Sequence, residues 1–171
     1  ATDAHKWLNV PYDCGIALVR DGAALRAAMA MTAAYLPPSG VRDPMHYSPD
    51  GSRRARAVDV WAALMTLGKR GLAEMVDRCC RQAARMGDAL RAAGHQVLND
   101  VTLNQVLVAF GDDHRTNRVI DAVQVAGVCW CGGTRWQGRD AMRISVSSWA
   151  TSDDDVDRSV ASILAAAESV A

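Results

Sequence analysis

The first residues in this sequence whose side chains could take part in catalysis are His5 and Lys6, which stand side by side near its start. They lie in ATDAHKWLNVPYDCG, between a polar start and an apolar run. A lysine at such a junction is either a solvated surface charge or a buried amine used for Schiff-base chemistry. The second use requires an amine that can lose its proton. These residues alone leave both alternatives open, so the elements around them have to be considered.

The composition indicates a globular chain without a dominant charge. Half of the 171 residues are apolar, which is enough for one domain with a sizeable core. The 19 basic and 19 acidic residues cancel, so no field would by itself recruit nucleic acid or an anionic membrane surface. The apolar runs are too short to span a bilayer, and the N-terminus has no signal pattern. We therefore expect a soluble, cytoplasmic protein that acts on a small molecule, with no nucleic-acid or membrane partner.

The five cysteines show no metal-binding pattern. None forms a CxxC pair or a Cys/His cluster with zinc-like spacing. Cys79 and Cys80 fall in a helical pattern, and Cys129 and Cys131 occupy alternate positions of an expected strand. We expect reduced thiols that act as small hydrophobic side chains, and no metal site.

The elements of the first half must hold the lysine and its surroundings. CGIALVRDG is a short apolar run closed by Asp21 and Gly22, which predicts a strand and a turn. Residues 23–35 are rich in Ala and Met and weakly helical. LPPSGVRDPMHYSPDG then contains four prolines and two glycines, so we expect no regular element there. A loop of this length in a compact protein is often a lid or a binding loop.

Two helices are expected next. Ser52 can cap a helix through RRARAVDVWAALMTLG, which ends near Gly68. A second helix over 72–90 ends at Gly94. Its apolar face comprises Leu72, Met75, Val76, Cys79, Ala83, Met86 and Leu90.

The second half alternates strands and helices. QVLND, QVLVAF, VCWC, TRW and MRISVS predict strands, with a helix over 116–126 between the second and the third. A last helix is capped by Ser152 and carries three acids at its positive end. Its buried stripe comprises Val156, Val160, Ile163 and Leu164. Interleaved strands and helices indicate an α/β or α+β domain with a sheet covered mainly on one side.

Three segments of the chain resemble, in order, segments of the group II pyridoxal-phosphate-dependent amino-acid decarboxylases. This is the family of the aromatic-amino-acid, glutamate, histidine and tyrosine decarboxylases. DAHKWLNVPYDCG resembles its cofactor-lysine segment, and SRRARAVDVWAALMTLGKRGL resembles its segment of Ser-Arg-Arg, then Trp, then Gly-x-x-Gly-Leu. MRISVSSWATSDDDVD resembles its C-terminal strand and helix start. Together the three segments cover nearly the whole chain.

The resemblance implies an α/β chain of PLP-dependent transferase fold type I, which is aspartate aminotransferase-like. Residues 1–70 would be the end of the PLP-binding large domain, with the cofactor-lysine segment, a mobile loop and a connecting helix. Residues 71–171 would be the small C-terminal α+β domain. The family's aspartate at the pyridinium nitrogen and its ring-stacking histidine come upstream of the lysine. We therefore expect a fragment that alone is inactive and binds the cofactor poorly.

The resemblance also assigns roles near the start of the chain. Lys6 would form the Schiff base with pyridoxal 5'-phosphate, as a buried amine, and His5 would lie beside the cofactor phosphate. A core histidine bonded to backbone is the alternative for His5. Asp3 departs from the family, in which many relatives have an asparagine that contacts phosphate. Because a carboxylate would repel phosphate, we expect Asp3 to orient a lysine, a histidine or a backbone group.

Two further residues receive roles from the resemblance. Tyr35 stands at the spacing of the family's mobile-loop tyrosine, whose phenol gives a proton to the substrate carbon once carbon dioxide has left. The alternative is a tyrosine that anchors the loop. Arg143 stands where relatives that act on acidic substrates use an arginine against a carboxylate. Arg143 alternatively holds the C-terminal domain against the rest of the enzyme.

The remaining arginine and tryptophan candidates are expected to be structural. Arg53 and Arg54 open a helix and oppose its macrodipole, so a compensating carboxylate or phosphate should lie nearby. Trp130, Trp136 and Trp149 are expected in the core or at an interface.

The expected activity is PLP-dependent decarboxylation of an amino acid to its amine and carbon dioxide, in a homodimer. Another PLP-dependent activity stays open, because the lysine motif does not fix which bond breaks: an aldehyde-forming deaminating decarboxylase, a lyase or an aminotransferase. A non-catalytic domain that retains the fold is the third alternative. The amino-acid substrate is not specified, because its side-chain pocket would be built largely outside this chain.

Overall fold

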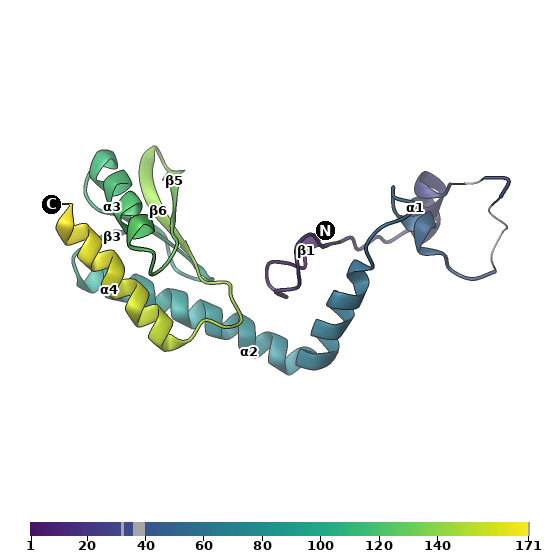
Figure 1. Cartoon of the computed structure of the whole chain (residues 1–171), viewed down its shortest axis with the longest axis horizontal. Coiled ribbons are helices and arrows are strands. Elements are labelled where there is room, and N and C mark those ends of the chain that lie inside the picture. The colour runs from purple at the N-terminus through teal and green to yellow at the C-terminus, as the bar shows by residue number, and fades with distance from the viewer. Residues whose placement is uncertain (32, 36–39, 171) are drawn as a thin grey trace. The chain divides into compact units, whose positions relative to one another are not determined.

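The computed structural model describes residues 1–31, 33–35 and 40–170. The chain forms two compact units, Ala1–Thr66 and Leu67–Ala171 (Figure 1). Their bounds resemble those of the two predicted domains, 1–70 and 71–171. The assignment of residues 1–70 to a large domain and of residues 71–171 to a small one stays a prediction.

The first unit contains a small apolar cluster under a two-stranded ribbon. Strand β1 (Thr2–Asp3) pairs antiparallel with β2 (Gly15–Ile16). The cluster consists of Ala4, Val10 and Cys14, with Leu8, Ile16, Val60 and Ala63 packed against it. The strand predicted over CGIALVRDG is wrong beyond Ile16. The register of the two strands ends there, and Leu18 is 86% exposed, so neither pairing nor burial holds the rest of the run extended.

Two short helices flank the Pro/Gly-rich segment. Helix α1 (Gly22–Met29) begins at Asp21, whose carboxylate accepts hydrogen bonds from two backbone N–H groups, and it is shorter than the predicted 23–35. The 3₁₀ helix η1 (Pro44–Tyr47) lies where we expected no regular element. Asp43 caps it, and proline fits a first turn because its missing N–H is not needed there. Residues 36–39 of the predicted loop lie outside the described residues.

Helix α2 (Arg56–Ala92) consists of two helical parts that meet in a kink at Gly68, so the two helices predicted for this segment are confirmed. It begins at Arg56 rather than after Ser52. The first part ends near Gly68, as predicted, because this residue has a non-helical backbone with φ 60° and ψ −175°. Only glycine adopts this backbone conformation readily, because a Cβ would clash there. The predicted apolar face of the second part is confirmed, since Met75, Cys79, Ala83, Met86 and Leu90 are buried.

The second unit is built on a four-stranded antiparallel sheet in the order β3-β4-β6-β5. Its strands are β3 (Gln96–Val97), β4 (Gln105–Ala109), β5 (Gly132–Trp136) and β6 (Arg139–Ser145). In the register, Val106 lies opposite Ile144 and Val108 opposite Met142, and all four side chains are buried. These pairs form the core face of the sheet.

Helices cover this core face. Helix α3 (Asp113–Ala126) packs against β6 and against α4 (Asp153–Ser169). In Figure 1, α3 and α4 lie on the same side of the sheet. The predicted sheet that is covered mainly on one side is therefore confirmed.

The strand predicted over VCWC is wrong. Cys129 lies in the loop between α3 and β5, and Cys131 is buried directly before β5. Gly127 ends α3 in the left-handed conformation, with φ 69°. Gln124 Nε2 then donates to the Cys131 carbonyl over 2.8 Å, which satisfies this backbone acceptor without a strand partner.

The two thiols of this loop are not equivalent. All five cysteines are free, but a hydrogen bond from Cys131 lowers the pKa of Cys129 to about 7. The same contact, with burial, raises the pKa of Cys131. Cys129 is therefore more than the small hydrophobic residue that we expected.

Helix α4 begins as the sequence predicts. Ser152 and Asp155 form a capping box, in which each side chain bonds the other's backbone N–H. Hydrogen bonds from Ser152 and then from Arg158 lower the pKa of Asp155 to about 2. Val156 and Ile163 are buried, while Val160 and Leu164 are half-buried. None of the helices within the described ranges is long and apolar enough to cross a membrane.

The tryptophans were expected in the core or at an interface, and the structure does not place them in the core. Trp130, Trp136 and Trp149 are 76%, 41% and 66% exposed. Their side chains stand on the surface of the second unit, so only the interface alternative stays open for them.

Replacing Gly68 with Ala should lower the free energy of unfolding by about 1–3 kcal/mol, because a Cβ is strained at its positive φ. Gly71→Ala is the matched control, since Gly71 is helical and a Cβ there meets Leu67 at ordinary contact distance. That change should stabilise by about 0.5–1 kcal/mol through reduced backbone entropy of the unfolded chain. Urea denaturation of both variants measures the difference. Equal effects of the two changes would contradict a special conformation at Gly68.

Candidate functional site

The turn between β1 and β2 holds Lys6 in a fixed backbone. The Ala4 N–H donates to the Cys14 carbonyl over 2.8 Å, which closes the base of the turn. At its tip, Asn9 donates to the Lys6 carbonyl from its backbone over 3.2 Å and from Nδ2 over 3.0 Å. Ala4 and Val10 point into the apolar cluster. The side chain of Lys6 is thereby directed away from the cluster.

The Lys6 amine pairs with Asp3. Nζ lies 2.8 Å from Asp3 Oδ2, and the two side chains are 67% and 46% exposed. The hydrogen bond and charge of Lys6 lower the pKa of Asp3, and those of Asp3 raise the pKa of Lys6. The expected burial of Lys6 is therefore wrong for this chain, because the turn projects the amine outward and the cluster lies beneath it. Orientation of a lysine is one of the roles that the sequence left open for Asp3.

The imidazole ring of His5 is the next polar group of the turn. Its ring stacks on Tyr12 with centroids 4.1 Å apart and planes tilted by 37°. Nδ1 is buried and has no hydrogen-bond partner among the described residues. Buried polar atoms are normally paired, so an unpaired one suggests a missing partner. The alternative for His5 was a core histidine that is hydrogen-bonded to backbone, and Nδ1 makes no such bond to a described residue.

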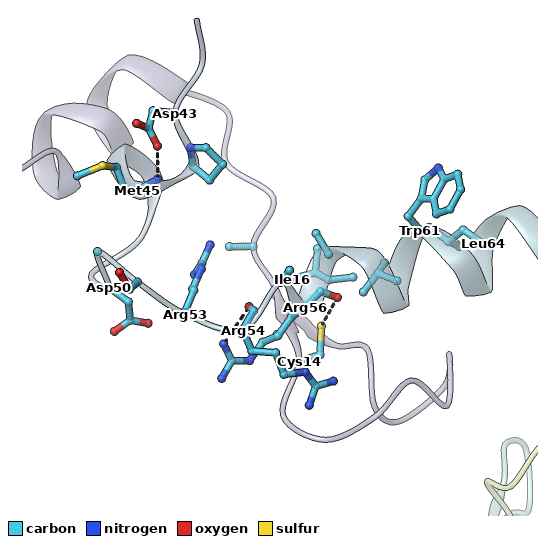
Figure 2. Close-up of a pocket in the computed structure, with 18 residues that line it drawn as sticks. Cys14, Ile16, Asp43, Met45, Asp50, Arg53, Arg54, Arg56, Trp61 and Leu64 are labelled. Atoms are coloured by element: carbon cyan, nitrogen blue, oxygen red, sulfur yellow. Dashed lines mark hydrogen bonds between the residues drawn. The ribbon is translucent and has the colours of Figure 1, made fainter. Parts of the chain in front are cut away.

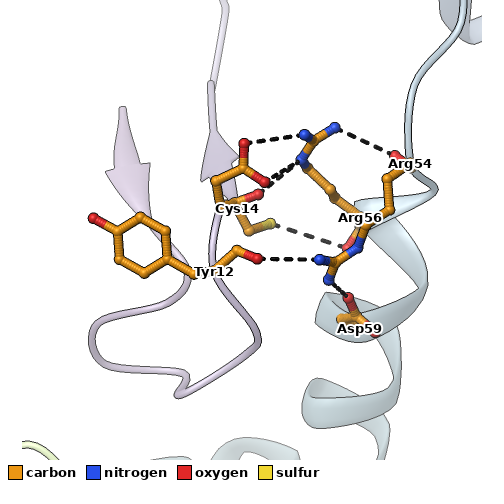
Figure 3. Close-up of polar contacts among 6 residues, drawn as sticks. Tyr12, Cys14, Arg54, Arg56 and Asp59 are labelled. Atoms are coloured by element: carbon orange, nitrogen blue, oxygen red, sulfur yellow. Dashed lines mark hydrogen bonds and ion pairs between the residues drawn. The ribbon is translucent and has the colours of Figure 1, made fainter.

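Two arginines at the start of α2 clamp the return strand of the turn (Figure 3). Arg54 donates to the Tyr12 carbonyl over 3.0 Å and pairs with Asp59. Arg56 donates in a fork to both carboxylate oxygens of Asp13, each over 3.0 Å. The carboxylate expected near the first arginines is confirmed by Asp59. The Arg56 clamp was missed, because residues 42 or more positions apart in the chain leave no local signal.

A cavity of about 1010 Å³ lies in the first unit, and β2 contributes to its lining (Figure 2). Ile16, Trp61 and Leu64 contribute apolar walls, and Asp43 and Arg53 contribute charges. No local pattern in the sequence indicates this cavity, because its lining comes from β2, η1, the segment before α2 and α2 itself. His5 and Lys6 are not among the lining residues.

The other two predicted site residues lie elsewhere. Tyr35 is 82% exposed in a turn, and within residues 1–31, 33–35 and 40–66 no hydrogen bond or ion pair joins it to the Lys6 turn. Arg143 belongs to the second unit, on β6 opposite Leu107 and Gly132. The structure thus brings Asp3, His5 and Lys6 together, and it does not bring Tyr35 to them.

The fold is that of fold type I pyridoxal-phosphate-dependent enzymes. A crystal structure of Oryza sativa TDC with PLP and tryptamine matches it with a TM-score of 0.81 and 18% sequence identity. The match covers 88% of this chain and 34% of that chain. The predicted fold class is therefore confirmed.

The pyridoxal-dependent decarboxylase conserved domain matches residues 1–111, and the chain belongs to that family. Histidine decarboxylase of Drosophila melanogaster is 30% identical over 162 residues, 91% of this chain and 19% of that protein. The 3,4-dihydroxyphenylacetaldehyde synthase of Aedes aegypti is 25% identical over 161 residues, 90% of this chain and 30% of that protein. The chain thus spans less than a third of the length of these curated relatives.

The cofactor of this family is pyridoxal 5'-phosphate, and residues of the turn fit it. Lys6 offers a primary amine on a fixed backbone. The unpartnered Nδ1 of His5, one residue away, offers a hydrogen-bonding group for a polar ligand. A primary amine beside a hydrogen-bonding nitrogen is thus compatible with that cofactor.

Replacing Asp3 with Asn should lower the pKa of Lys6 toward its ordinary value of about 10.4, because Asp3 is what raises it. The pair stabilises the fold only between its two pKa values. It is lost as the pH falls through the lowered pKa of Asp3, and as the pH rises through the raised pKa of Lys6. NMR of isotope-labelled lysine measures the pKa directly.

Lys69 is the only other lysine and serves as internal reference in this measurement. Asp88→Asn is the matched control, because it removes an exposed carboxylate that pairs with Arg91 in the second unit. It should leave the pKa of Lys6 unchanged. An equal pKa of Lys6 in the parent and the Asp3→Asn protein would show that the ion pair does not form in solution.

Proposed function

We propose that this chain is part of a pyridoxal-phosphate-dependent amino-acid decarboxylase, in which Lys6 is the covalent attachment point of the cofactor. The observation that carries the proposal is the amine of Lys6, held on a rigid turn beside an unpartnered histidine nitrogen in a chain of this family. When bound, the cofactor supplies an electron-withdrawing ring on which an amino acid can lose its carboxylate as carbon dioxide.

Attachment of the cofactor requires a neutral Lys6 amine, and Asp3 opposes this requirement. As the turn stands, Asp3 keeps the amine protonated, because it raises the pKa of Lys6. Transfer of the proton to Asp3 is unfavourable, since the same contact lowers the pKa of that carboxylate. The rest of the enzyme would therefore have to cover Lys6, because burial disfavours the charged amine. We propose that the parts of the enzyme outside this chain supply that cover.

The other predicted residues take roles that agree with their chemistry. His5 would donate to or accept from the cofactor through Nδ1. Tyr35 would supply a proton to the substrate carbon through its phenol O–H. Arg143 would bind a substrate carboxylate through its planar fork. In the complete enzyme we propose a homodimer, with 1–70 ending the large domain and 71–171 forming the small one.

An aldehyde-forming activity is the second candidate. The similarity to 3,4-dihydroxyphenylacetaldehyde synthase of Aedes aegypti, at 25% identity, favours it. The two activities share cofactor and substrate class and differ in what happens at the substrate carbon after carbon dioxide leaves. A proton delivered there by Tyr35 would favour the amine, so the product distinguishes the candidates.

Replacing Lys6 with Ala in the full-length protein should abolish covalent cofactor attachment and turnover, because no amine would remain at this position. Incubation with pyridoxal phosphate, reduction with borohydride and mass spectrometry of the peptides measure the attachment. Lys69→Ala is the matched control and should keep both adduct and activity, since Lys69 is an exposed lysine on α2. An adduct on Lys69 instead of Lys6 in the parent protein would refute the assignment.

Replacing Tyr35 with Phe should slow amine formation by about 100-fold or more, because the change removes a general acid and keeps the ring. Carbon dioxide release should continue at a reduced rate, with aldehyde and ammonia increasing relative to amine. Tyr47→Phe is the matched control, since Tyr47 keeps its ring contact with Arg42, whose Cζ lies 4.6 Å from the ring centroid. Amine formation as fast and as clean as in the parent would leave Tyr35 only an anchoring role.

A further inference from the structure

A second pocket lies in the second unit, between α2 and the start of α4. Its volume is about 260 Å³, and its walls are Arg78, Arg81, Gln82, Arg85 and Asp153. The three arginines follow one stripe of α2, because residues three, four and seven positions apart share a helix face. Three guanidinium groups thus surround a small space that contains one carboxylate.

The charges around this pocket are not fully compensated. Arg85 pairs with Asp157 over 2.7 Å and with Asp153 over 3.7 Å, which accounts for the carboxylate on the wall. Arg78 uses Nη2 to donate to the Trp149 carbonyl over 2.7 Å. Arg81 is exposed and has no ion pair with any residue in the described part of the chain. The pocket therefore favours an anion.

Two buried polar atoms at the pocket have no hydrogen-bond partner among the described residues. They are Arg78 Nε and Gln82 Oε1. Gln82 is only 2% exposed. Its Nε2 donates to the Thr151 carbonyl over 3.0 Å and to Asp153 Oδ1 over 3.1 Å. Because both of these partners are acceptors, the amide cannot be flipped, and Oε1 is the atom left without a donor.

This arrangement specifies the chemistry of the missing group. The guanidinium groups of Arg78 and Arg81 need anionic oxygens, while Gln82 Oε1 needs a hydroxyl or N–H donor. Sulfate and chloride supply the negative charge but no donor. A protonated phosphoryl group, as in hydrogen phosphate, supplies both. We propose that this pocket binds such a group, at a site in the second unit that is independent of Lys6 and of the proposed activity.

Titration calorimetry of the full-length protein in a phosphate-free, low-chloride buffer tests this site. Inorganic phosphate should bind with a stoichiometry of one, and at least about tenfold more tightly than sulfate, because sulfate leaves the buried Oε1 unpaired. Methyl phosphate distinguishes two sources of the group. Tighter binding of methyl phosphate assigns the site to phosphomonoesters, and weaker binding assigns it to free phosphate, and both results support a phosphoryl site.

Arg81→Gln should weaken phosphate binding by about tenfold or more, since it removes a charge-assisted hydrogen bond. The change should leave the fold intact, because Arg81 is exposed. Arg118→Gln is the matched control, which removes an exposed arginine from α3 in the same unit, and it should bind phosphate as the parent does. Absence of phosphate binding, equal binding of sulfate, or equal losses in the two variants would overturn the proposal.

Discussion

The position of Lys6 depends on the clamp between the start of α2 and the return strand of its turn. The apolar cluster under the turn contains three buried residues, Ala4, Val10 and Cys14, which is too few to fix an orientation by packing. Exposed ion pairs such as Arg56 with Asp13 contribute little to stability, because water screens their charges. These contacts matter for geometry. The planar fork of Arg56 holds Asp13, and Arg54 holds the Tyr12 carbonyl, so two successive residues of the turn are fixed to the start of α2.

The ion pair of Asp3 and Lys6 links this geometry to chemistry. An exposed lysine paired with a carboxylate is a poor nucleophile, because it stays protonated. For Lys6, the hydrogen bond to Asp3 and the charge of Asp3 both raise the pKa of the amine. The same pair keeps the amine at a defined place while it is protonated. Covering the turn would remove water from both groups and weaken the charged state. If Lys6 attaches the cofactor as we propose, the turn positions the amine and a cover over the turn favours its neutral form.

Features set by local pattern could be predicted from the sequence. The cap at Ser152 and the apolar face of α2 follow from spacing alone, and β4 and β6 were placed for the same reason. Features that depend on distant partners could not. The VCWC run lacks a strand because Gln124 takes the carbonyl that a ladder would use, and the cavity beside β2 is closed by segments far apart in the chain. Lys6 was expected to be buried because Schiff-base formation in the family requires a neutral amine. Its exposure in this chain could not be predicted, because no local pattern in the sequence indicates it.

The register of β6 separates structural from functional positions in the second unit. Met142 and Ile144 face α3 with Val108 and Val106, so they belong to the core. Because side chains alternate along a strand, Arg143 lies on the opposite face, beside Leu107 and Gly132. Arg143 is exposed, although its two neighbours on the strand are buried. β6 is an inner strand of the sheet, and the charge of Arg143 does not disturb the core because its side chain lies on the exposed face. Its side chain is therefore accessible on the surface and does not pack into the core under α3.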